Sequence, residues 1–289
     1  MLVRVKGVEA MALTEKRTPD MIEFLFPEGK DKAVTFSYDD AQIYDRRLVS
    51  IFDQYGMKGT FHLNSGTLGE REYITKDEVG TLYDNHEVAC HAVTHPFFNE
   101  LSQGMMVREL LEDRRALEGY TNRIVRGFSY PFGEYSDRLM ETARQLGIVY
   151  ARTVEDRMNF NLPGDFMCWH PTCHHNKVTD AMIEDFLNPP MYRNLALFYI
   201  WGHSFEFERE NNWDHIRHIC EALQGREDVW YATNIEIYEY VTAIRSLVMS
   251  ADGRIIYNPT ATPVYLMIGY TKACVPAGMS LTLCGEKQS

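Results

Sequence analysis

The sequence predicts an α/β fold: a distorted, TIM-barrel-like barrel of seven parallel strands and helices, with a small β-rich appendage at its C-terminal end. From about residue 33 to residue 245, short runs of β-branched and aromatic residues alternate with helical patterns, which is typical of a parallel sheet closed into a barrel. From residue 246 onward, strand-like runs broken by Gly and Pro follow one another without a helix. We therefore expect a barrel over 1–245, with its core from about residue 33, and an extension over 246–289.

The barrel strands and the helix starts can be read from local patterns. Thr75 and Glu78 have the spacing of a capping box, and Ser102, Ser136 and Thr233 each stand directly before a helical pattern. Seven runs separated by such helices are the expected strands: "AVTFSY", "GTFHLN", "EVAC", "IVRGFSY", "IVYAR", "LALFYIW" and "VWYA".

Composition limits the classes of partner. The 289 residues are 45% hydrophobic, enough for a sizeable core, and 41 acidic against 29 basic residues give a net charge of −12. Such a chain repels nucleic acid and anionic membrane surfaces, so we expect neither as a partner. The first twenty residues carry charges every few positions and resemble neither a signal peptide nor a membrane anchor, which favours a cytoplasmic location.

The cysteines are scattered along the chain and form no CxxC pair. This distribution favours reduced, mostly buried thiols over a disulfide framework. The six cysteines are Cys90, Cys168, Cys173, Cys220, Cys274 and Cys284.

Polar residues gather directly after the predicted strands. Asp39 and Asp40 follow the first strand, His91 and His95 follow the third, and His203 follows the sixth. The carboxyl ends of barrel strands meet at one face, and a carboxylate with two histidines suits a divalent catalytic metal ion. Adjacent residues in extended chain point in opposite directions, so one aspartate can bind the metal while the other accepts a proton.

Four motifs resemble the NodB-like polysaccharide deacetylases, carbohydrate esterase family 4. "SYDDA" is similar to the first motif of that family, "HEVACHAVTHP" to the second, "YPFG" to the third and "IWGHS" to the last, in the family's order over roughly residues 33–245. The resemblance implies the same distorted barrel of strands and helices. It also implies that Asp40, His91 and His95 bind the metal, usually zinc, with cobalt, nickel or manganese as alternatives.

The resemblance implies a catalytic role for three further positions. Asp39 would be the general base, His203 the general acid, and the backbone N–H of Phe132 a donor to the oxyanion. Protonation of the leaving group is chemically necessary, because an amide nitrogen departs poorly without a proton.

The chain departs from the family pattern where the catalytic residues are supported. Ala92 replaces the usual Ser or Thr after the first metal histidine. Ser129 stands where the family arginine that supports the base is expected, which leaves Arg126 as the candidate substitute. Cys168 stands where a second acid is expected, which leaves Asp165 to tune His203.

Aromatic residues of the motifs are expected to line the substrate cleft. The resemblance places Tyr130, Pro131, Trp169 and Trp201 there, and Trp201 replaces a leucine of the acyl pocket, which favours acetyl or formyl over longer acyl groups. Glu206 in "SFEFERENNWD" is a candidate supporting residue or sugar contact.

The segment "CWHPTCHH" has two interpretations. Its cysteines and histidines could form a second zinc site, or they could line the substrate cleft on a long loop, and we favour the cleft. The residues concerned are Cys168, His170, Cys173, His174 and His175.

These patterns predict a metal-dependent deacetylase that removes an N-acetyl or O-acetyl group from a carbohydrate. Two alternatives remain: a metal-dependent hydrolase of a small non-sugar amide, cyclic ureide or imide, and a catalytically inactive carbohydrate-binding relative. The expected partner is an acetylated saccharide or a small amide, and a homo-oligomer is left open.

Overall fold

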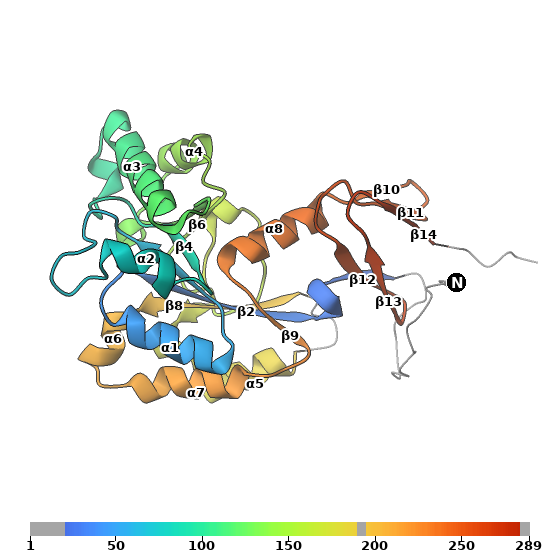
Figure 1. The fold of residues 1–289 in the computed structure, drawn as a ribbon. Helices are drawn as coiled ribbons and strands as arrows, with labels where there is room; N and C mark the ends of the chain where they lie inside the picture. Colours follow the sequence, from blue (N-terminus) through green and yellow to red (C-terminus); the bar gives the residue numbers. More distant parts are fainter. Residues whose placement is uncertain (1–20, 190–194, 284–289) are drawn as a thin grey trace, which may run out of the picture.

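A curved parallel sheet forms the centre of the computed structural model, which describes residues 21–189 and 195–283 (Figure 1). Strand β2 lies in the middle of the sheet. One of its edges pairs with β8 along the whole strand, and the other pairs with β9 at residues 32–34 and with β3 at residues 36–39. The strand order is β6-β5-β4-β3-β2-β8-β7. The strands are β2 (Lys32–Asp39), β3 (Gly59–Leu63), β4 (Glu87–Cys90), β5 (Gly127–Ser129), β6 (Tyr150–Arg152), β7 (Cys173–His174), β8 (Ala196–His203) and β9 (Val229–Tyr231).

An irregular segment, residues 169–174, connects the two edges of this sheet. The Trp169 N–H donates to the Ala151 carbonyl over 3.0 Å, and the Thr172 N–H donates to the Tyr199 carbonyl over 2.8 Å. The last two residues of the segment form β7, which pairs with β8. The predicted seven-stranded distorted barrel is therefore confirmed. The seventh barrel strand is this segment, however, whereas the predicted strand "VWYA" pairs only with residues 32–34 of β2.

Helices cover the outside of the barrel. Figure 1 shows α1, α5 and α7 on one side and α3 and α4 on the opposite side. Thr75 forms the predicted capping box, Thr233 forms a second one at the predicted start of α8, and the Ser102 and Ser136 hydroxyls accept from Met105 N and Leu139 N. The helices are α1 (Asp45–Tyr55), α2 (Lys76–Leu82), α3 (Gln103–Thr121), α4 (Asp137–Gln145), α5 (Asp180–Leu187), α6 (Ser204–Arg209), α7 (Trp213–Leu223) and α8 (Asn234–Arg245).

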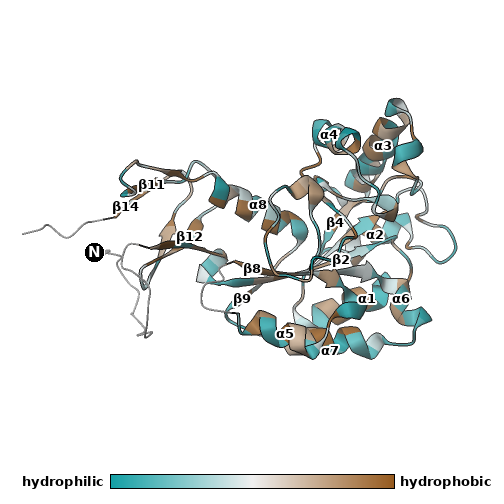
Figure 2. Cartoon of the chain, turned by 180° about the vertical axis from the view of Figure 1, so that it is seen from behind, coloured by the Kyte–Doolittle hydropathy of each residue, from teal (hydrophilic) through white to brown (hydrophobic). Residues whose placement is uncertain are grey.

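Two apolar clusters make up the core, and the strands that carry them are the brown elements in the middle of Figure 2. Phe36, Phe52 and Phe61 pack together between β2, β3 and α1, with ring centroids 4.7–6.3 Å apart. The second cluster surrounds Trp169 and continues through α8 to Leu266 of the appendage. Barrel and appendage thus share a buried apolar contact.

The appendage consists of two small antiparallel sheets. One contains β10 (Val248–Met249), β11 (Ile255–Tyr257) and β14 (Ser280–Thr282), and the other contains β12 (Val264–Ile268), β13 (Thr271–Val275) and β1 (Ile22–Leu25). The N-terminal strand β1, which the sequence left unassigned, therefore belongs to the predicted C-terminal extension by its strand pairing. The Tyr240 hydroxyl of α8 donates to the Leu25 carbonyl over 2.6 Å and fixes this strand to the barrel.

The cysteines in the described ranges are free thiols, as the sequence predicts, while Cys284 lies outside those ranges. Among the described residues, no helix is both long and apolar enough to cross a bilayer.

Candidate active site

The carboxyl ends of β2, β4, β5 and β8 bring the predicted polar residues to one face of the barrel. The parallel register pairs Asp39 with His62 of β3 on one side and with His203 of β8 on the other. His91 follows β4 directly, and Ser129 ends β5. Four segments that are distant in the sequence therefore supply one site.

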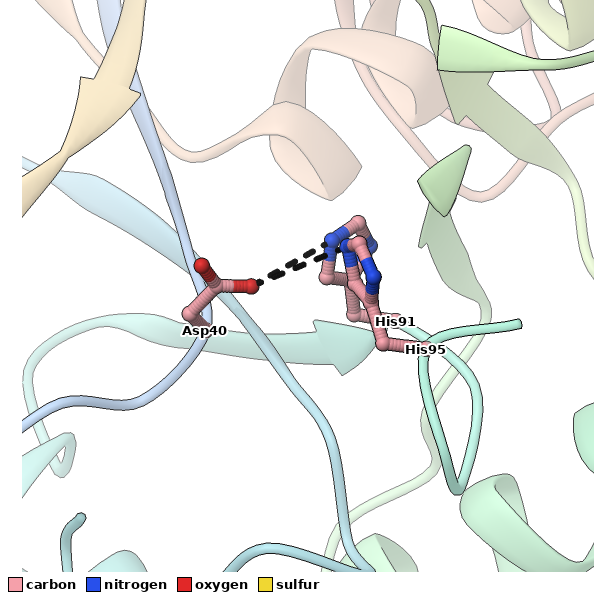
Figure 3. Close-up of side chains that lie close together, drawn as sticks. All are labelled: Asp40, His91 and His95. Carbon is pink, nitrogen blue, oxygen red and sulfur yellow. Dashed lines mark ion pairs between the residues drawn. The ribbon is translucent and has the colours of Figure 1, made fainter. Parts of the chain in front are cut away.

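Asp40, His91 and His95 form a cluster with the geometry of a metal site. Asp40 Oδ1 lies 3.6 Å from His91 Nε2 and 3.9 Å from His95 Nε2, and Figure 3 shows both imidazoles facing this carboxylate. The three ligand atoms lie within 4.8 Å of one another. Two imidazoles and one carboxylate with open positions are the donor set of a catalytic divalent metal ion, so these residues fit such an ion.

A hydrogen-bond chain orients His91 for this role. Its Nδ1 lies 2.9 Å from the Ser129 carbonyl and 2.7 Å from Ser129 Oγ, and that hydroxyl donates to Asp39 Oδ1 over 3.1 Å. The carbonyl can only accept a hydrogen bond, so Nδ1 carries the proton. Nε2, which faces Asp40, therefore has a free lone pair that can bind a metal ion. Such outer contacts fix the tautomer of a metal-binding histidine.

Left-handed backbone conformations concentrate around this cluster. Asp40, Ala41, Ala92, His95 and Phe132 have φ values of 80°, 57°, 68°, 53° and 57°. Each such conformation costs on the order of 1 kcal/mol for a residue with a side chain, and neighbouring structure must hold it in place.

Asn64 and Asp113 supply this support beside Ala92. The Asn64 side-chain amide donates to the carbonyls of His91 and Ala92, the latter over 3.0 Å. The buried Asp113 carboxylate of α3 accepts from His91 N over 3.0 Å and from Ser65 N over 2.8 Å. Burial raises the pKa of Asp113 to about 7, although these hydrogen bonds lower it.

Arg152, at the end of β6, supports Asp39. Its guanidinium forms an ion pair with Asp39 Oδ2 and donates to Ser37 Oγ over 3.0 Å, and both charged side chains are buried. Burial would raise the pKa of Asp39, but the Arg152 charge outweighs it and holds this pKa well below its usual range. The expectation for Arg126 is corrected: it precedes β5 by one residue, and its guanidinium pairs with Glu239 of α8.

Glu206, in the first turn of α6, is the acid beside His203. Its Oε2 accepts from His203 N over 3.0 Å and lies 3.5 Å from His203 Nδ1. Burial lowers the pKa of His203, but the Glu206 carboxylate raises it and the net shift is upward. The expectation for Asp165 is corrected: it caps the 3-10 helix at Phe166–Cys168 and pairs with Arg144 over 2.6 Å.

The side chains of Phe132, the predicted oxyanion donor, and of Trp201, a predicted cleft residue, lie beside histidines of the site. Phe132 is 52% exposed, and its ring stacks on Phe97 at 3.9 Å and meets His95 edge-on at 4.3 Å. Trp201 lies between the Arg152 guanidinium, 4.6 Å from its ring centre, and His174 at 4.9 Å.

All four residues expected in the cleft are buried, including Trp201 with 9% of its surface exposed. The Tyr130 hydroxyl donates to the Met167 carbonyl over 2.7 Å, and Pro131 beside it is also buried. The expectation for Trp169 is corrected, because its ring packs against Tyr150 and Tyr199 in the second core cluster.

The sequence carried signals for two of the missed residues. Arg152 is a charged residue that ends the otherwise apolar run "IVYAR". Asp113 lies on the same helical face as the buried residues Met106, Leu110 and Leu117 of α3, where an acid needs buried partners.

Comparisons with known proteins agree with this fold and with the motifs. A model of the polysaccharide deacetylase family matches residues 27–151. The chitooligosaccharide deacetylase of Sinorhizobium fredii (strain NBRC 101917 / NGR234) is 23% identical over 135 residues, which cover 46% of this chain and 61% of that protein. The chain therefore matches about three fifths of the length of this curated relative.

Solved structures share the barrel. A candidate polysaccharide deacetylase from Mycobacterium smegmatis aligns with a TM-score of 0.58 and 19% identity, over 76% of this chain and 93% of that one. A family 4 acetyl xylan esterase from Clostridium thermocellum, determined with a cobalt ion, aligns with a TM-score of 0.51 and 15% identity, over 72% and 90%. Residues 27–151 of this chain are therefore similar to the polysaccharide deacetylase family, and the solved structures show that the barrel fold is shared.

Proposed function

We propose that this chain is a metal-dependent deacetylase that hydrolyses an N-acetyl or O-acetyl group of a carbohydrate. The observation that carries this proposal is the convergence of Asp40, His91 and His95 at one strand-end face, directly beside Asp39 and His203. Five polar side chains gathered at one partly buried face of the barrel are costly to retain unless they act together.

A divalent metal ion held by Asp40, His91 and His95, with zinc the preferred element, would polarise the acyl carbonyl and make a nearby water more acidic. Asp39 is placed to take the proton of that water, since its Oδ2 lies 3.8 Å from His91 Nε2. The Arg152 ion pair keeps Asp39 ionised and therefore able to accept a proton. Ser129 fixes the other carboxylate oxygen.

His203 faces the same cluster from β8 and is placed to protonate the leaving group. Its Nε2 lies 3.9 Å from Asp40 Oδ2, while Glu206 on the Nδ1 side stabilises the imidazolium. The proton available at Nε2 can then pass to the departing nitrogen or oxygen as the acyl bond breaks.

The proposal includes Phe132 and Trp201 as parts of the acyl site. The left-handed φ of 57° at Phe132 holds the backbone of "YPFG" beside His95, and its N–H is our candidate donor to the oxyanion. Trp201 narrows the wall next to His203, with ring centroids 5.9 Å apart, which favours acetyl over longer acyl groups.

Hydrolysis of two substrate panels tests this function, measured as acetate release for the saccharides and as loss of the intact substrate for the small amides, ureides and imides. The zinc-loaded protein is incubated with N-acetylated and O-acetylated saccharides and, separately, with small amides, ureides and imides, and Asp39→Asn is the control. We expect acetate from the saccharides and none from the control. Hydrolysis confined to the small amides would replace the carbohydrate part of the proposal, and no hydrolysis of either panel would reject it.

A further inference from the structure

A second cluster of ligand-type side chains lies on the far side of His203 from Asp40. It is formed by His174, the last residue of β7, His175, the first residue of the following 3-10 helix (His175–Lys177), and Glu206 of α6. The cluster contains part of the sequence segment "CWHPTCHH", which the proposed deacetylation does not use.

Three ligand atoms converge within this cluster. Glu206 Oε2 lies 2.9 Å from His174 Nε2 and 3.6 Å from His175 Nε2, and one ligand atom of each residue lies within 4.8 Å of the others. Consecutive residues of a strand point in opposite directions, but the strand ends at His174 and the helix begins at His175. The two imidazoles therefore lie side by side, with centroids 4.2 Å apart.

His175 is held in a position that leaves its polar atoms unsatisfied. The ring is fully buried between Tyr38, at 5.8 Å, and Phe207, at 4.1 Å, and neither ring nitrogen has a hydrogen-bond partner. It also packs on Gly202, where a Cβ atom would lie 2.1 Å from His175 Nδ1. A buried polar atom without a partner costs on the order of 1–3 kcal/mol, and a metal ion at Nε2 would satisfy one of the two ring nitrogens.

We propose that His174, His175 and Glu206 form a second binding site for a divalent transition-metal ion, with zinc as the element that fits the donors best. Two imidazoles and a carboxylate suit zinc, and the separations of 2.9 and 3.6 Å bracket those of neighbouring ligands around a tetrahedral ion. The two cysteines of the segment are not ligands: Cys173 Sγ contacts Met182 Sδ, and Cys168 Sγ lies beside His170.

Metal binding requires one local change at His174. Its Nδ1 now accepts a 3.3 Å hydrogen bond from the Asn176 N–H, so the proton is on Nε2. Coordination through Nε2 moves that proton to Nδ1 and breaks this long hydrogen bond. Asn176 is exposed, and water can replace the lost partner of its N–H.

Metal binding at this second site should inhibit deacetylation, an inference that rests on the proposed function. Glu206 Oε2 is also the atom beside His203 Nδ1. A metal ion that takes this oxygen draws it away from His203 N and Nδ1, which it now holds in place, so the proposed acid loses its fixed position. Zinc beyond the first equivalent should therefore slow acetate release.

Metal stoichiometry tests the site without any need for activity. The metal-stripped full chain is dialysed against excess zinc, and bound zinc is measured by elemental analysis. We expect about two ions per chain for the wild type and about one for His174→Gln, for Glu206→Gln and for His91→Ala. The control His218→Gln alters an exposed histidine 2.6 Å from Asp180 and should keep about two.

Two results would overturn the site: about one ion in the wild type, or about two in both His174→Gln and Glu206→Gln. Circular dichroism of each variant confirms that it is folded.

For the catalytic step, acetate release is measured at excess zinc and at one equivalent of zinc. The rate at excess zinc should be about tenfold lower than the rate at one equivalent in the wild type, and the two rates should be about equal in His174→Gln. Equal ratios would reject the inhibition, and an absence of acetate release at every zinc level would reject the proposed function while leaving the stoichiometry result intact.

Discussion

Arg152 and Asp39 form an ion pair between two buried side chains that lie 113 positions apart in the sequence. Arg152 also donates to the Thr153 carbonyl over 3.0 Å and lies over the Trp201 ring, so its guanidinium is fixed on several sides. This pair connects β6 to β2 across the barrel. It determines the charge of the carboxylate that we propose as the base.

Replacing Arg152 should therefore affect both stability and activity. Arg152→Met leaves the Asp39 carboxylate buried without its partner, which should lower the free energy of unfolding by about 3–5 kcal/mol. Urea denaturation and acetate release measure the two effects, and Arg152→Lys serves if the Met variant does not fold. The matched control is Arg126→Met, which removes a surface pair with Glu239 and should cost no more than about 1 kcal/mol. A larger loss of unfolding free energy in Arg126→Met than in Arg152→Met would contradict the role of Arg152 as the partner of Asp39.

Asp113 should control the shape of the loop that carries the metal-binding histidines. Asp113→Asn keeps one acceptor oxygen for two backbone donors, Ser65 N and His91 N, so one of them loses its partner. We expect a loss of about 1–3 kcal/mol in unfolding free energy and about tenfold weaker zinc binding. Denaturation and competition with a zinc chelator measure these changes. The exposed Asp185→Asn is the control, and equal zinc affinity in the two variants would contradict the role of Asp113.

Trp201 should set the length of the acyl group. Trp201→Leu opens the wall between Arg152 and His174, so the ratio of kcat/KM for propionyl over acetyl substrates should rise about tenfold or more. Competition kinetics with paired substrates give this ratio directly. Trp230→Leu changes a tryptophan that packs on Phe26 and Tyr240, away from the site, and should leave the ratio unchanged. A ratio that is the same in Trp201→Leu and wild type would remove Trp201 from the acyl pocket.

Glu87 should make stability depend on pH. Its oxygens accept from Tyr150, Thr60 and Ile235 N, yet burial dominates and raises the pKa of Glu87 from 4.5 to about 7. Between these values the folded chain holds a proton that the unfolded chain has released, so the contribution of Glu87 to stability falls as pH rises, by at most about 3 kcal/mol.

Glu87→Gln isolates this contribution, because the amide keeps the shape and has no titrating proton. Urea denaturation between pH 4.5 and pH 7 should show a smaller decrease of stability with pH in Glu87→Gln than in the wild type. Glu112→Gln, which changes an exposed glutamate paired with Arg115, should follow the wild type. Parallel curves for all three proteins would show that Glu87 does not titrate in this range.

The sequence predicts the strand-end cluster well because its members are local to the strands that carry them. Asp39 ends β2, Asp40 follows it directly, and His91 and His95 follow β4, so a correct strand assignment places them on one face. The partner of Asp39 could not be found in this way. Arg126 is nearer to the expected position in the sequence, but Arg152 reaches Asp39 because β6 ends at the same face.

The position of β1 could not be predicted from the sequence either, because its partner strand is also distant in the sequence. Residues 22–25 pair with 265–268 in an antiparallel sheet, and no local pattern connects segments so far apart. Glu206 was visible as a polar residue three positions after His203, but only the start of α6 at Ser204 brings its carboxylate back to the His203 N–H.

We propose that Asp40, His91 and His95 hold a catalytic metal ion and that Asp39 acts beside it as the base. The most direct measurement is zinc content together with acetate release, on wild type, Asp39→Asn and His91→Ala at one equivalent of zinc. We predict that Asp39→Asn binds zinc as the wild type does and releases acetate at least about 100-fold more slowly, and that added zinc does not restore His91→Ala. Undiminished acetate release in Asp39→Asn, or a folded wild type that binds no zinc, would contradict the account.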